Sequence, residues 1–184
     1  MKKPDLDQLR LETPRLLLRP PRLEDFDAWA LFQEDEVATR FVGGPQPRAL
    51  AWRSFMCMCG AWHMTGVAMF SVFEKASGKW VGRLGPWNPE GWPEPEVGWG
   101  IVREHWGKGY ASEGAAAAMD YAFDHLGWER VIHVIDPQNL ASIGVAKKLG
   151  STLLGRVKLP APYETAVTDS WGQTREQWRG RGLG

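Results

Sequence analysis

The residues most able to do chemistry lie between Glu96 and Gly114, in the run EVGWGIVREHWGKGYASEG. Its first part, 96–102, is short, apolar and rich in β-branched and aromatic side chains, which predicts a strand. Apolar side chains recur at helical spacing from Tyr110 onward, which predicts a helix. The loop between them, 106–109, can turn backbone N–H groups toward a ligand, and the helix dipole adds partial positive charge. The stretch predicts a phosphate cradle, with a plain tight turn as the alternative.

Two common nucleotide motifs do not fit this glycine loop. A Walker-type site needs Lys and then Ser or Thr after its last glycine. Gly109 and Gly114 have the required spacing, but Ala115 and Ala116 occupy those two positions, which excludes that site. The dinucleotide fingerprint needs a third Gly or Ala where this chain has Ser112, and no clear acidic ribose ligand follows the next strand.

The elements that must position this stretch alternate between strand and helix patterns. They predict one mixed sheet with helices on both faces, in a single domain covering 1–184. We expect the first ten residues and 175–184 to be a loose lead-in and a solvated tail. The expected strands are 15–19, 67–74, 79–84, 96–102, 130–136, 151–157 and 163–171; the expected helices are 24–33, 48–64, 110–126 and 139–149; and 86–95 is expected to be a loop.

Residue types at the helix ends support two of these assignments. Gly127 is well placed to end the helix that begins at Tyr110. Asn139 is expected to be the N-cap of the following helix, and Gly150 is expected just beyond its C-terminus. These signals fix the borders of the two helices that flank strand 130–136.

Composition excludes several classes of protein. Of the 184 residues, 43% are hydrophobic and 24% are charged, as in ordinary globular proteins. Lys and Arg together number 22, as do Asp and Glu, so no global field favours nucleic acid or an anionic membrane. The N-terminal run lacks the apolar core of a secretory signal, and no apolar run is long enough to span a membrane. We therefore expect a cytoplasmic protein with reduced thiols and neither kind of partner.

The two cysteines do not predict a disulfide or a metal site. Cys57 and Cys59 are two residues apart in a helix-like segment, so their side chains point to different sides. Cys59 and His63 could share a helix face, but two ligands without further partners rarely hold a metal. We expect no metal.

The segment 48–64 is apolar almost all round. Such a helix is either buried or packed against a ligand or a partner. Eleven tryptophans in the chain leave two interpretations open, an aromatic pocket or ordinary core and surface positions. Together these features admit a homodimer.

Beyond the single loop, three segments resemble the GNAT N-acetyltransferases, and within them the Rim-type branch of ribosomal-protein N-terminal acetyltransferases. The loop of that family is written Gln/Arg-x-x-Gly-x-Gly/Ala after a strand, and the run 104–109, EHWGKG, is similar to it. The match runs from about Leu11 to Gly155 and rests on LETPRLLLRPPRLEDFDAW, VGWGIVREHWGKGYASEG and VIHVIDPQNLASIGVAKKLG, in this order. The resemblance implies an α+β fold of three α/β/α layers. Its sheet is mixed and mostly antiparallel, with two central parallel strands that splay apart.

The resemblance also implies where coenzyme A would bind. The loop amides would hold its pyrophosphate, and the pantetheine arm would pair with backbone near Ile101 and Val102, between strands 96–102 and 131–136. Asn139 and Ser142 match the family's N-x-x-S pattern close to pantetheine and the thioester sulfur, although an N-cap alone also explains Asn139. The implied loop contacts come from Trp106, Gly107, Lys108, Gly109, Tyr110 and Ala111.

This chain departs from the family pattern at two positions. Glu104 stands where the loop has Gln or Arg, and a carboxylate near a polyanion is unhelpful unless it points to solvent. Ala146 stands where many members carry the tyrosine that protonates the leaving thiolate. Ser142, or a water, would have to take that role.

The remaining chemistry concerns the amine acceptor. Glu96 opens the cofactor strand, where related enzymes place a base for the ammonium proton; a solvated strand-end Glu is the alternative. His133 could titrate near neutrality, but a satisfied core histidine is the favoured interpretation. Glu94 and Asp136 are weaker candidates. The residues predicted to wall the acceptor site are Trp87, Trp92 and Trp99, with the loop 86–95 carrying specificity.

The sequence therefore predicts direct transfer of an acetyl group from acetyl-CoA to a primary amine, in a ternary complex. The acceptor would be a protein N-terminus or a small-molecule amine. The alternative is a non-catalytic acyl-CoA sensor, which the missing tyrosine and Glu104 make credible. A nucleotide-binding domain of another type is a more distant alternative.

Overall fold

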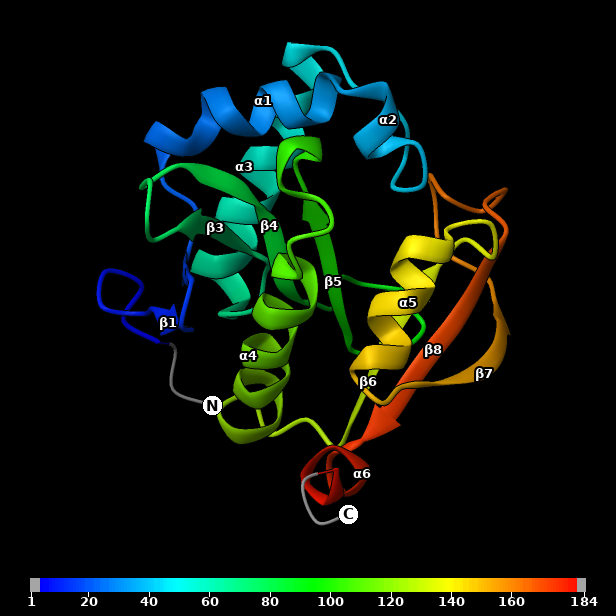
Figure 1. Cartoon of the computed structure of the whole chain (residues 1–184). Coiled ribbons are helices and arrows are strands. Elements are labelled where there is room, and N and C mark those ends of the chain that lie inside the picture. The colour runs from blue at the N-terminus through cyan, green and yellow to red at the C-terminus, as the bar shows by residue number, and fades with distance from the viewer. Residues whose placement is uncertain (1–3, 182–184) are drawn as a thin grey trace.

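A computed structural model describes residues 4–181; the ends of the expected lead-in and tail, 1–3 and 182–184, lie outside the described residues. The strands form one sheet in the order β1-β2-β3-β4-β5-β6-β8-β7, with helices on both faces (Figure 1). The strands are β1 (Leu11–Glu12), β2 (Leu16–Arg19), β3 (Phe70–Glu74), β4 (Trp80–Trp87), β5 (Glu96–Ile101), β6 (Arg130–Ile135), β7 (Thr152–Val157) and β8 (Thr168–Thr174). The helices are η1 (Leu23–Asp25), α1 (Phe26–Glu34), α2 (Glu36–Thr39), α3 (Arg48–Thr65), η2 (Arg103–His105), α4 (Tyr110–Asp124), α5 (Leu140–Lys148) and α6 (Arg175–Gly180).

The mixed sheet predicted from the sequence is confirmed. All neighbouring strands pair antiparallel except β5 and β6, which run parallel. These two strands share a single register pair, Glu96 with Ile132, while each pairs along its length with its other neighbour. The backbone N–H of Ile132 also donates to the carbonyl of Pro95, at 2.9 Å. Beyond this point the two strands diverge, so the sheet opens at its centre.

Helix α4 packs very closely on the sheet because one of its residues has no side chain. A Cβ built on Gly114 would lie 2.5 Å from a methyl of Leu84 in β4 and 3.4 Å from one of Leu16 in β2. Ala115, Ala118 and Met119 are fully buried on the same helix. The small residues on this face of α4 therefore let the helix lie directly against β4 and β2.

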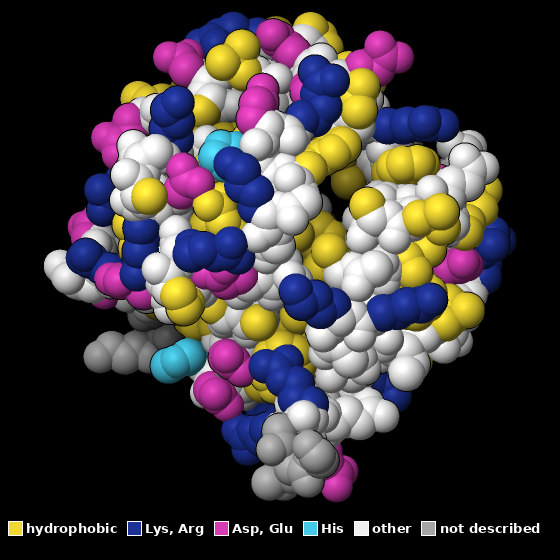
Figure 2. All heavy atoms as spheres, in the orientation of Figure 1, with side chains coloured by type: hydrophobic (Ala, Val, Ile, Leu, Met, Phe, Trp, Pro, Cys, Tyr) yellow, Lys and Arg dark blue, Asp and Glu magenta, His cyan; other side chains and the backbone are white. Residues whose placement is uncertain are grey.

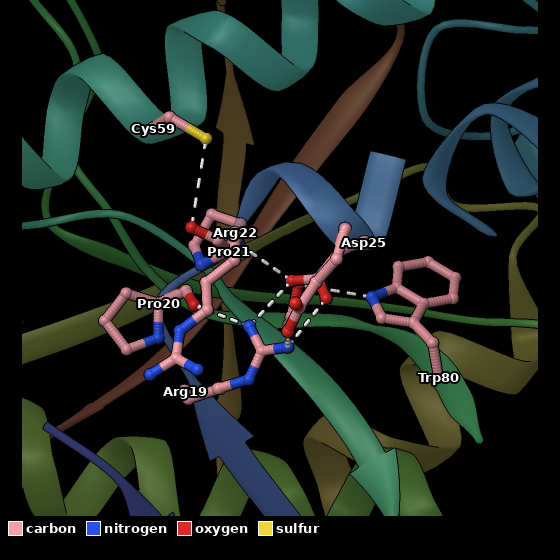
Figure 3. Close-up of polar contacts among 9 residues, drawn as sticks. Arg19, Pro20, Pro21, Arg22, Asp25, Cys59 and Trp80 are labelled. Carbon is pink, nitrogen blue, oxygen red and sulfur yellow. Dashed lines mark hydrogen bonds and ion pairs between the residues drawn. The ribbon is translucent and has the colours of Figure 1, made fainter. Parts of the chain in front are cut away.

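The buried carboxylate of Asp25 holds the segment between β2 and α1 in place (Figure 3). Arg19 donates to both oxygens of Asp25, at 2.7 and 2.8 Å, and the backbone N–H of Arg22 donates to the same carboxylate at 2.9 Å. Ser71 on β3 donates a further hydrogen bond at 2.8 Å, and its own hydroxyl accepts from the indole of Trp80 at 3.2 Å. The cluster therefore joins β2, β3, β4 and the start of α1.

Strand β4 and the C-terminal tail differ from the sequence prediction. Strand β4 continues through Pro86 to Trp87, because Pro86 needs no donor where it faces Val97. The solvated tail predicted for 175–184 is wrong as far as Gly180, because α6 forms there and buries Trp178. The indole of Trp178 donates to Asp120 on α4 at 2.7 Å, so this helix closes the end of the domain.

Helix α3 is less buried than its composition predicted. It buries Ala51, Phe55, Met58 and Trp62, which are spaced along one face. Leu50, Trp52, Met56 and Met64 are exposed. Among residues 4–181, no helix combines the length and apolar character that a membrane crossing requires.

The Asp25 cluster gives a test of stability. Replacing Asp25 with Ala leaves Arg19, whose side chain is 13% exposed, without its buried partner. We expect the free energy of unfolding in urea to fall by about 3–5 kcal/mol, since breaking one side of a buried pair is strongly destabilising and the exposed carboxylate of Glu24, at 3.0 Å, replaces it only in part. The matched control is Asp27→Ala, whose carboxylate is 82% exposed and pairs with Arg48 at the surface. That change should cost less than about 1 kcal/mol; equal losses in the two variants would contradict this account.

Candidate active site

Glu96 is buried at the point where β5 and β6 separate. The residue is 6% exposed, so the alternative interpretation, a solvated Glu at the end of a strand, is wrong. One carboxylate oxygen accepts the backbone N–H of Val134 on β6 at 3.1 Å, and the other accepts the indole N–H of Trp92 at 2.7 Å. Burial raises the pKa of Glu96 from 4.5 to about 7, although both hydrogen bonds and the charge of Arg83 act in the opposite direction. A carboxylate with such a pKa can exchange a proton near neutral pH.

His133 bridges the opening from the opposite strand. One ring nitrogen, Nδ1, contacts the carbonyl of Val97 on β5 at 2.7 Å, and Nε2 contacts the hydroxyl of Ser151 at 3.0 Å. Gln173 donates to the same hydroxyl at 2.8 Å, so Ser151 donates its own proton to Nε2 and Nδ1 carries the ring proton. Burial lowers the pKa of His133 to about 4, which keeps the ring neutral. The favoured interpretation, a satisfied core histidine, is confirmed.

The glycine loop lies directly before α4, and hydrogen bonds from Arg15 hold it in place. Gly109 is the N-cap of α4 and adopts a left-handed conformation, with φ of 80° and no side chain to cap the helix. Arg15 donates to the carbonyl of Lys108 at 2.9 Å and to Glu113 at 2.6 Å. The first-turn amides of α4 are therefore presented by a braced loop and receive no side-chain cap. Glu104 is exposed, so its carboxylate is on the solvent side of the loop.

The loop opens onto a hollow with several cationic side chains. Its volume is about 340 Å³, and Gly109 and Ser112 line it together with Arg15, Lys148 and Arg181. Glu113 also lines the hollow and pairs with Arg15, so Lys148, Arg181 and the uncapped amides at the start of α4 provide the net positive character that favours a polyanion. Arg15 and Arg181 were not singled out from the sequence. Arg181 follows α6, in the segment predicted to be a solvated tail.

Asn139 and Ser142 lie at the start of α5, facing β5 across the opening. Asn139 accepts the backbone N–H of Ser142 at 3.1 Å, which confirms the predicted N-cap. The hydroxyl of Ser142 accepts the indole N–H of Trp99 at 3.2 Å. Because Trp99 supplies the donor in this contact, the hydroxyl proton of Ser142 remains available to another acceptor. Ala146 is fully buried one turn further along α5.

The backbone of β5 offers hydrogen-bonding groups to this opening. Val102 donates its N–H to the carbonyl of Val81 at 3.0 Å, so this group faces β4 rather than the opening. The carbonyl of Ile101 faces the other way and accepts the indole N–H of Trp106 at 2.6 Å. Figure 2 shows that the surface is hollowed between α2 and α5, with apolar side chains around the hollow.

The three tryptophans predicted to wall the acceptor site occupy different positions. Trp87 lies opposite Glu96 in the sheet, and Trp92 donates to its carboxylate. Trp99 points instead to α5 and packs on His133 with ring centres 4.8 Å apart. Tyr163, which the sequence did not single out, packs edge-on to Trp92 at 6.4 Å.

The two weaker base candidates do not join this site. Glu94 forms an ion pair with Arg130 at 3.5 Å, at the entry to β6. Asp136 accepts the backbone N–H of Gln138 at 2.7 Å and shapes the turn that leads to α5. Among the carboxylates considered from the sequence, Glu96 therefore has the geometry and the pKa of a base.

The family described as "Acetyltransferase (GNAT) domain" matches residues 15–152 of this chain. The chain belongs to the GNAT acetyltransferase family. It is 31% identical to the N-acetyltransferase p20 of Bacillus licheniformis over 160 residues, which cover 85% of this chain and 88% of p20. Two further curated relatives match it over only about half of their own length.

Solved GNAT structures share the fold. A crystal structure of an acetyltransferase from Agrobacterium tumefaciens str. C58 is 28% identical, with a TM-score of 0.81 over 95% of this chain and 99% of that one. RimJ of Mycobacterium smegmatis, solved in complex with CoA-disulfide, is 19% identical, with a TM-score of 0.70 over 92% of this chain and 87% of that one. The α+β architecture predicted for this chain is therefore the GNAT fold.

The raised pKa of Glu96 predicts how stability depends on pH. The folded-state value of about 7 lies above the ordinary 4.5, so the folded chain holds this proton more tightly than the unfolded chain. The stabilisation is fully present below pH 4.5 and is lost as pH rises through 7. Relative to Glu96→Gln, the wild-type free energy of unfolding should fall by about 3 kcal/mol across that interval, measured by urea unfolding.

The control for this measurement is Glu104→Gln, which removes an exposed carboxylate from the glycine loop. The difference in free energy of unfolding between Glu104→Gln and the wild type should stay nearly constant over the same pH interval. A wild-type advantage over Glu96→Gln that grows with pH would contradict the raised pKa.

Proposed function

We propose that this GNAT protein transfers the acetyl group of acetyl-CoA to a primary amine, directly and in a ternary complex. The single observation that carries the proposal is the arrangement at the two ends of β5: Glu96, a buried carboxylate with a pKa raised to about 7, begins the strand, and the braced start of α4 follows its other end. A cytoplasmic location and a homodimer remain expectations from the sequence.

The donor fits the cationic hollow and the loop beside it. We assign the pyrophosphate to the loop amides from Gly107 to Ala111, supported by the uncapped start of α4, whereas the expected amide of Trp106 donates to the carbonyl of Arg103 at 3.0 Å. Arg15, Lys148 and Arg181 lie around the same hollow and complement the remaining phosphate charge. Acetyl-CoA supplies an acyl group activated as a thioester.

The pantetheine arm would run beside β5, in the opening. Ile101 presents its carbonyl there, although the indole of Trp106 occupies it and would have to give way. Asn139 orders the first turn of α5 and thereby places Ser142 on the opposite wall. Of the two backbone positions expected to bind the arm, Ile101 is better oriented than Val102.

Two side chains account for the proton transfers. The carboxylate of Glu96 accepts a proton from the ammonium group of the acceptor, directly or through water, because its pKa matches neutral pH. As the C–S bond breaks, the hydroxyl of Ser142 donates its proton to the departing sulfur and takes up the second proton of the attacking nitrogen, directly or through water; Trp99 occupies a lone pair and leaves the O–H free. Holding the two reactants in one opening supplies much of the rate.

Binding of the donor is tested by thermal unfolding. Saturating acetyl-CoA should raise the melting temperature of the wild type through ligand linkage. Gly109→Ala should lose most of this shift, because its φ of 80° disfavours a side chain and the loop amides would turn away. Gly78→Ala is the matched control: it has a φ of 67° in the turn between β3 and β4, with no heavy atom within 4 Å of its added Cβ.

The control variant should be destabilised like Gly109→Ala and yet keep the full acetyl-CoA shift. Loss of the shift in both variants would mean that strain, not the loop, explains the result. If acetyl-CoA does not raise the melting temperature of the wild type, the proposal that acetyl-CoA is the donor is wrong.

An assay of thiol release from acetyl-CoA distinguishes catalysis from binding alone. A panel of small amines and peptide N-termini should include an acceptor that releases free thiol from acetyl-CoA. With that acceptor, kcat/KM should rise with pH and level off above about 7, as Glu96 loses its proton. Glu96→Gln should lower kcat by about 10²–10⁴-fold and remove this pH dependence of kcat/KM. A sensor would bind acetyl-CoA and release no thiol above background with any amine.

A further inference from the structure

Among residues 4–181, the side-chain donor to Glu96 is the indole of Trp92. Its Nε1–H donates to Oε2 of Glu96 at 2.7 Å, while the backbone N–H of Val134 donates to Oε1 at 3.1 Å. One hydrogen bond on each oxygen fixes the orientation of the carboxylate, because a rotation would break both. A carboxylate has about four lone-pair sites, so those that remain can still accept a proton from an amine or a water.

The loop that carries Trp92 is held at several points. The backbone N–H of Trp92 donates to the carbonyl of Pro89 at 3.1 Å, and the carbonyl of Pro95 accepts a backbone N–H of β6 at 2.9 Å. A Cβ on Gly91 would lie 3.4 Å from the Cβ of Pro160, in the segment between β7 and β8. The prolines of the loop also fix φ at their own positions. The indole is therefore carried by a restricted backbone.

The phenol ring of Tyr163 packs against this indole. The two rings meet edge-on with their centres 6.4 Å apart, and a Cβ on Gly43 would lie 3.4 Å from the Tyr163 ring on another side. Trp92 is half-buried, and a half-buried indole can satisfy its N–H with water. Here the N–H is instead directed at a buried carboxylate. This geometry favours a specific role for Trp92 over ordinary surface packing.

The charged groups on the neighbouring elements do not replace this hydrogen bond. Within residues 4–181, Arg83 on β4 forms no ion pair, so its charge acts on Glu96 only from a distance. Arg130 at the start of β6 pairs with Glu94 at 3.5 Å. His133 on β6 is neutral at pH 7, because burial lowers its pKa to about 4. The indole is thus the side chain in direct contact with the carboxylate.

We propose that Trp92 is a positioning residue for the base: its indole N–H holds the carboxylate of Glu96 in the ionised form and in a fixed orientation. This inference rests on the proposed function, in which Glu96 accepts the proton of the amine. A neutral N–H donor stabilises a carboxylate more than a carboxylic acid, so it counteracts the effect of burial. Without this donor, the carboxyl group would keep its proton to higher pH and could not act as a base near neutrality.

The first test measures the pH dependence of kcat/KM in Trp92→Phe, which keeps an aromatic ring and removes the N–H. The acceptor is an amine that releases thiol with the wild type. The midpoint should rise from about 7 by at least about one pH unit, since a hydrogen bond to a charged group contributes at least about that much. At pH 7, kcat/KM should fall by at least about fivefold, and it should largely recover above the new midpoint.

The second test needs no substrate. The free energy of unfolding of Trp92→Phe is compared with that of Trp92→Phe/Glu96→Gln over a range of pH, and the wild type is compared with Glu96→Gln in the same way. In each pair the difference falls with rising pH and levels off at the folded-state pKa of Glu96. It should level off near pH 7 for the wild type and at least about one unit higher for Trp92→Phe.

Trp87→Phe is the matched control, again compared with and without Glu96→Gln. Trp87 flanks Glu96 on the paired strand β4, while the hydrogen bonds to the carboxylate come from Trp92 and Val134. The control therefore shrinks a neighbouring ring and leaves both hydrogen bonds in place. Its unfolding difference should still level off near pH 7. If the control moves this pH as far as Trp92→Phe does, ring packing explains the effect and the inference is overturned.

A third measurement uses the wild type, so it holds even if Trp92→Phe does not fold. In a proton–nitrogen correlation NMR spectrum, one indole N–H signal should titrate with a midpoint near pH 7 and should stop titrating in Glu96→Gln. The reason is that this proton lies between the indole and the titrating carboxylate. The inference is overturned if no indole signal behaves in this way.

An unchanged midpoint in Trp92→Phe, in either kcat/KM or unfolding, also overturns the inference, even if the variant is slower. A purely structural role would lower the rate without moving the midpoint. Failure of the proposed function looks different, because no thiol is released with any amine. The unfolding and NMR titrations then still report on the hydrogen bond: a shifted titration supports the role of Trp92 in holding the ionised carboxylate, and an unshifted one overturns it.

Discussion

The opening between β5 and β6 is the constraint on which the rest of the site depends. Two parallel strands that share one register pair leave backbone N–H and C=O groups without a ladder partner. Buried backbone groups must find partners elsewhere. Here side chains supply them, since Glu96 accepts from the N–H of Val134 and His133 contacts the carbonyl of Val97. A carboxylate from one strand and an imidazole from the other thus hold the sheet open at a fixed width.

Burial shifts the pKa values of Glu96 and His133 in opposite directions, and both shifts favour the uncharged form of the side chain. The pKa of Glu96 rises to about 7 because water cannot solvate the carboxylate, and that of His133 falls to about 4 because the imidazolium is equally disfavoured. At neutral pH this leaves Glu96 as the group able to change charge. His133 has its structural hydrogen bonds on both ring nitrogens, so it positions the strand without exchanging a proton.

The sequence predicted the elements whose signals are local. The strand, glycine loop and helix from Glu96 onward, the N-cap at Asn139 and the mixed sheet depend on short-range patterns, and the structure reproduces them. The tail was mispredicted because α6 is short and polar, and its contacts, such as that of Trp178 with Asp120, reach residues more than fifty positions earlier in the sequence. The environment of Glu96 could not be predicted without the fold, because Trp92 and Val134 approach its carboxylate from two separate segments.

Arg83 illustrates why charge is the hardest property to interpret from sequence. In the run WVGRLG it stands among apolar residues, and nothing local says whether its side chain faces solvent or a closed face. Only the register with β5 places it with Glu96, and only α1 covers it with aromatic rings. An unpaired guanidinium in such a place lowers the stability of the free protein. Proteins concentrate such local costs at functional sites. The fold thus places a positive and a negative group on one face of the sheet, with the side chain of Met69 between them, and no local sequence pattern reveals this arrangement.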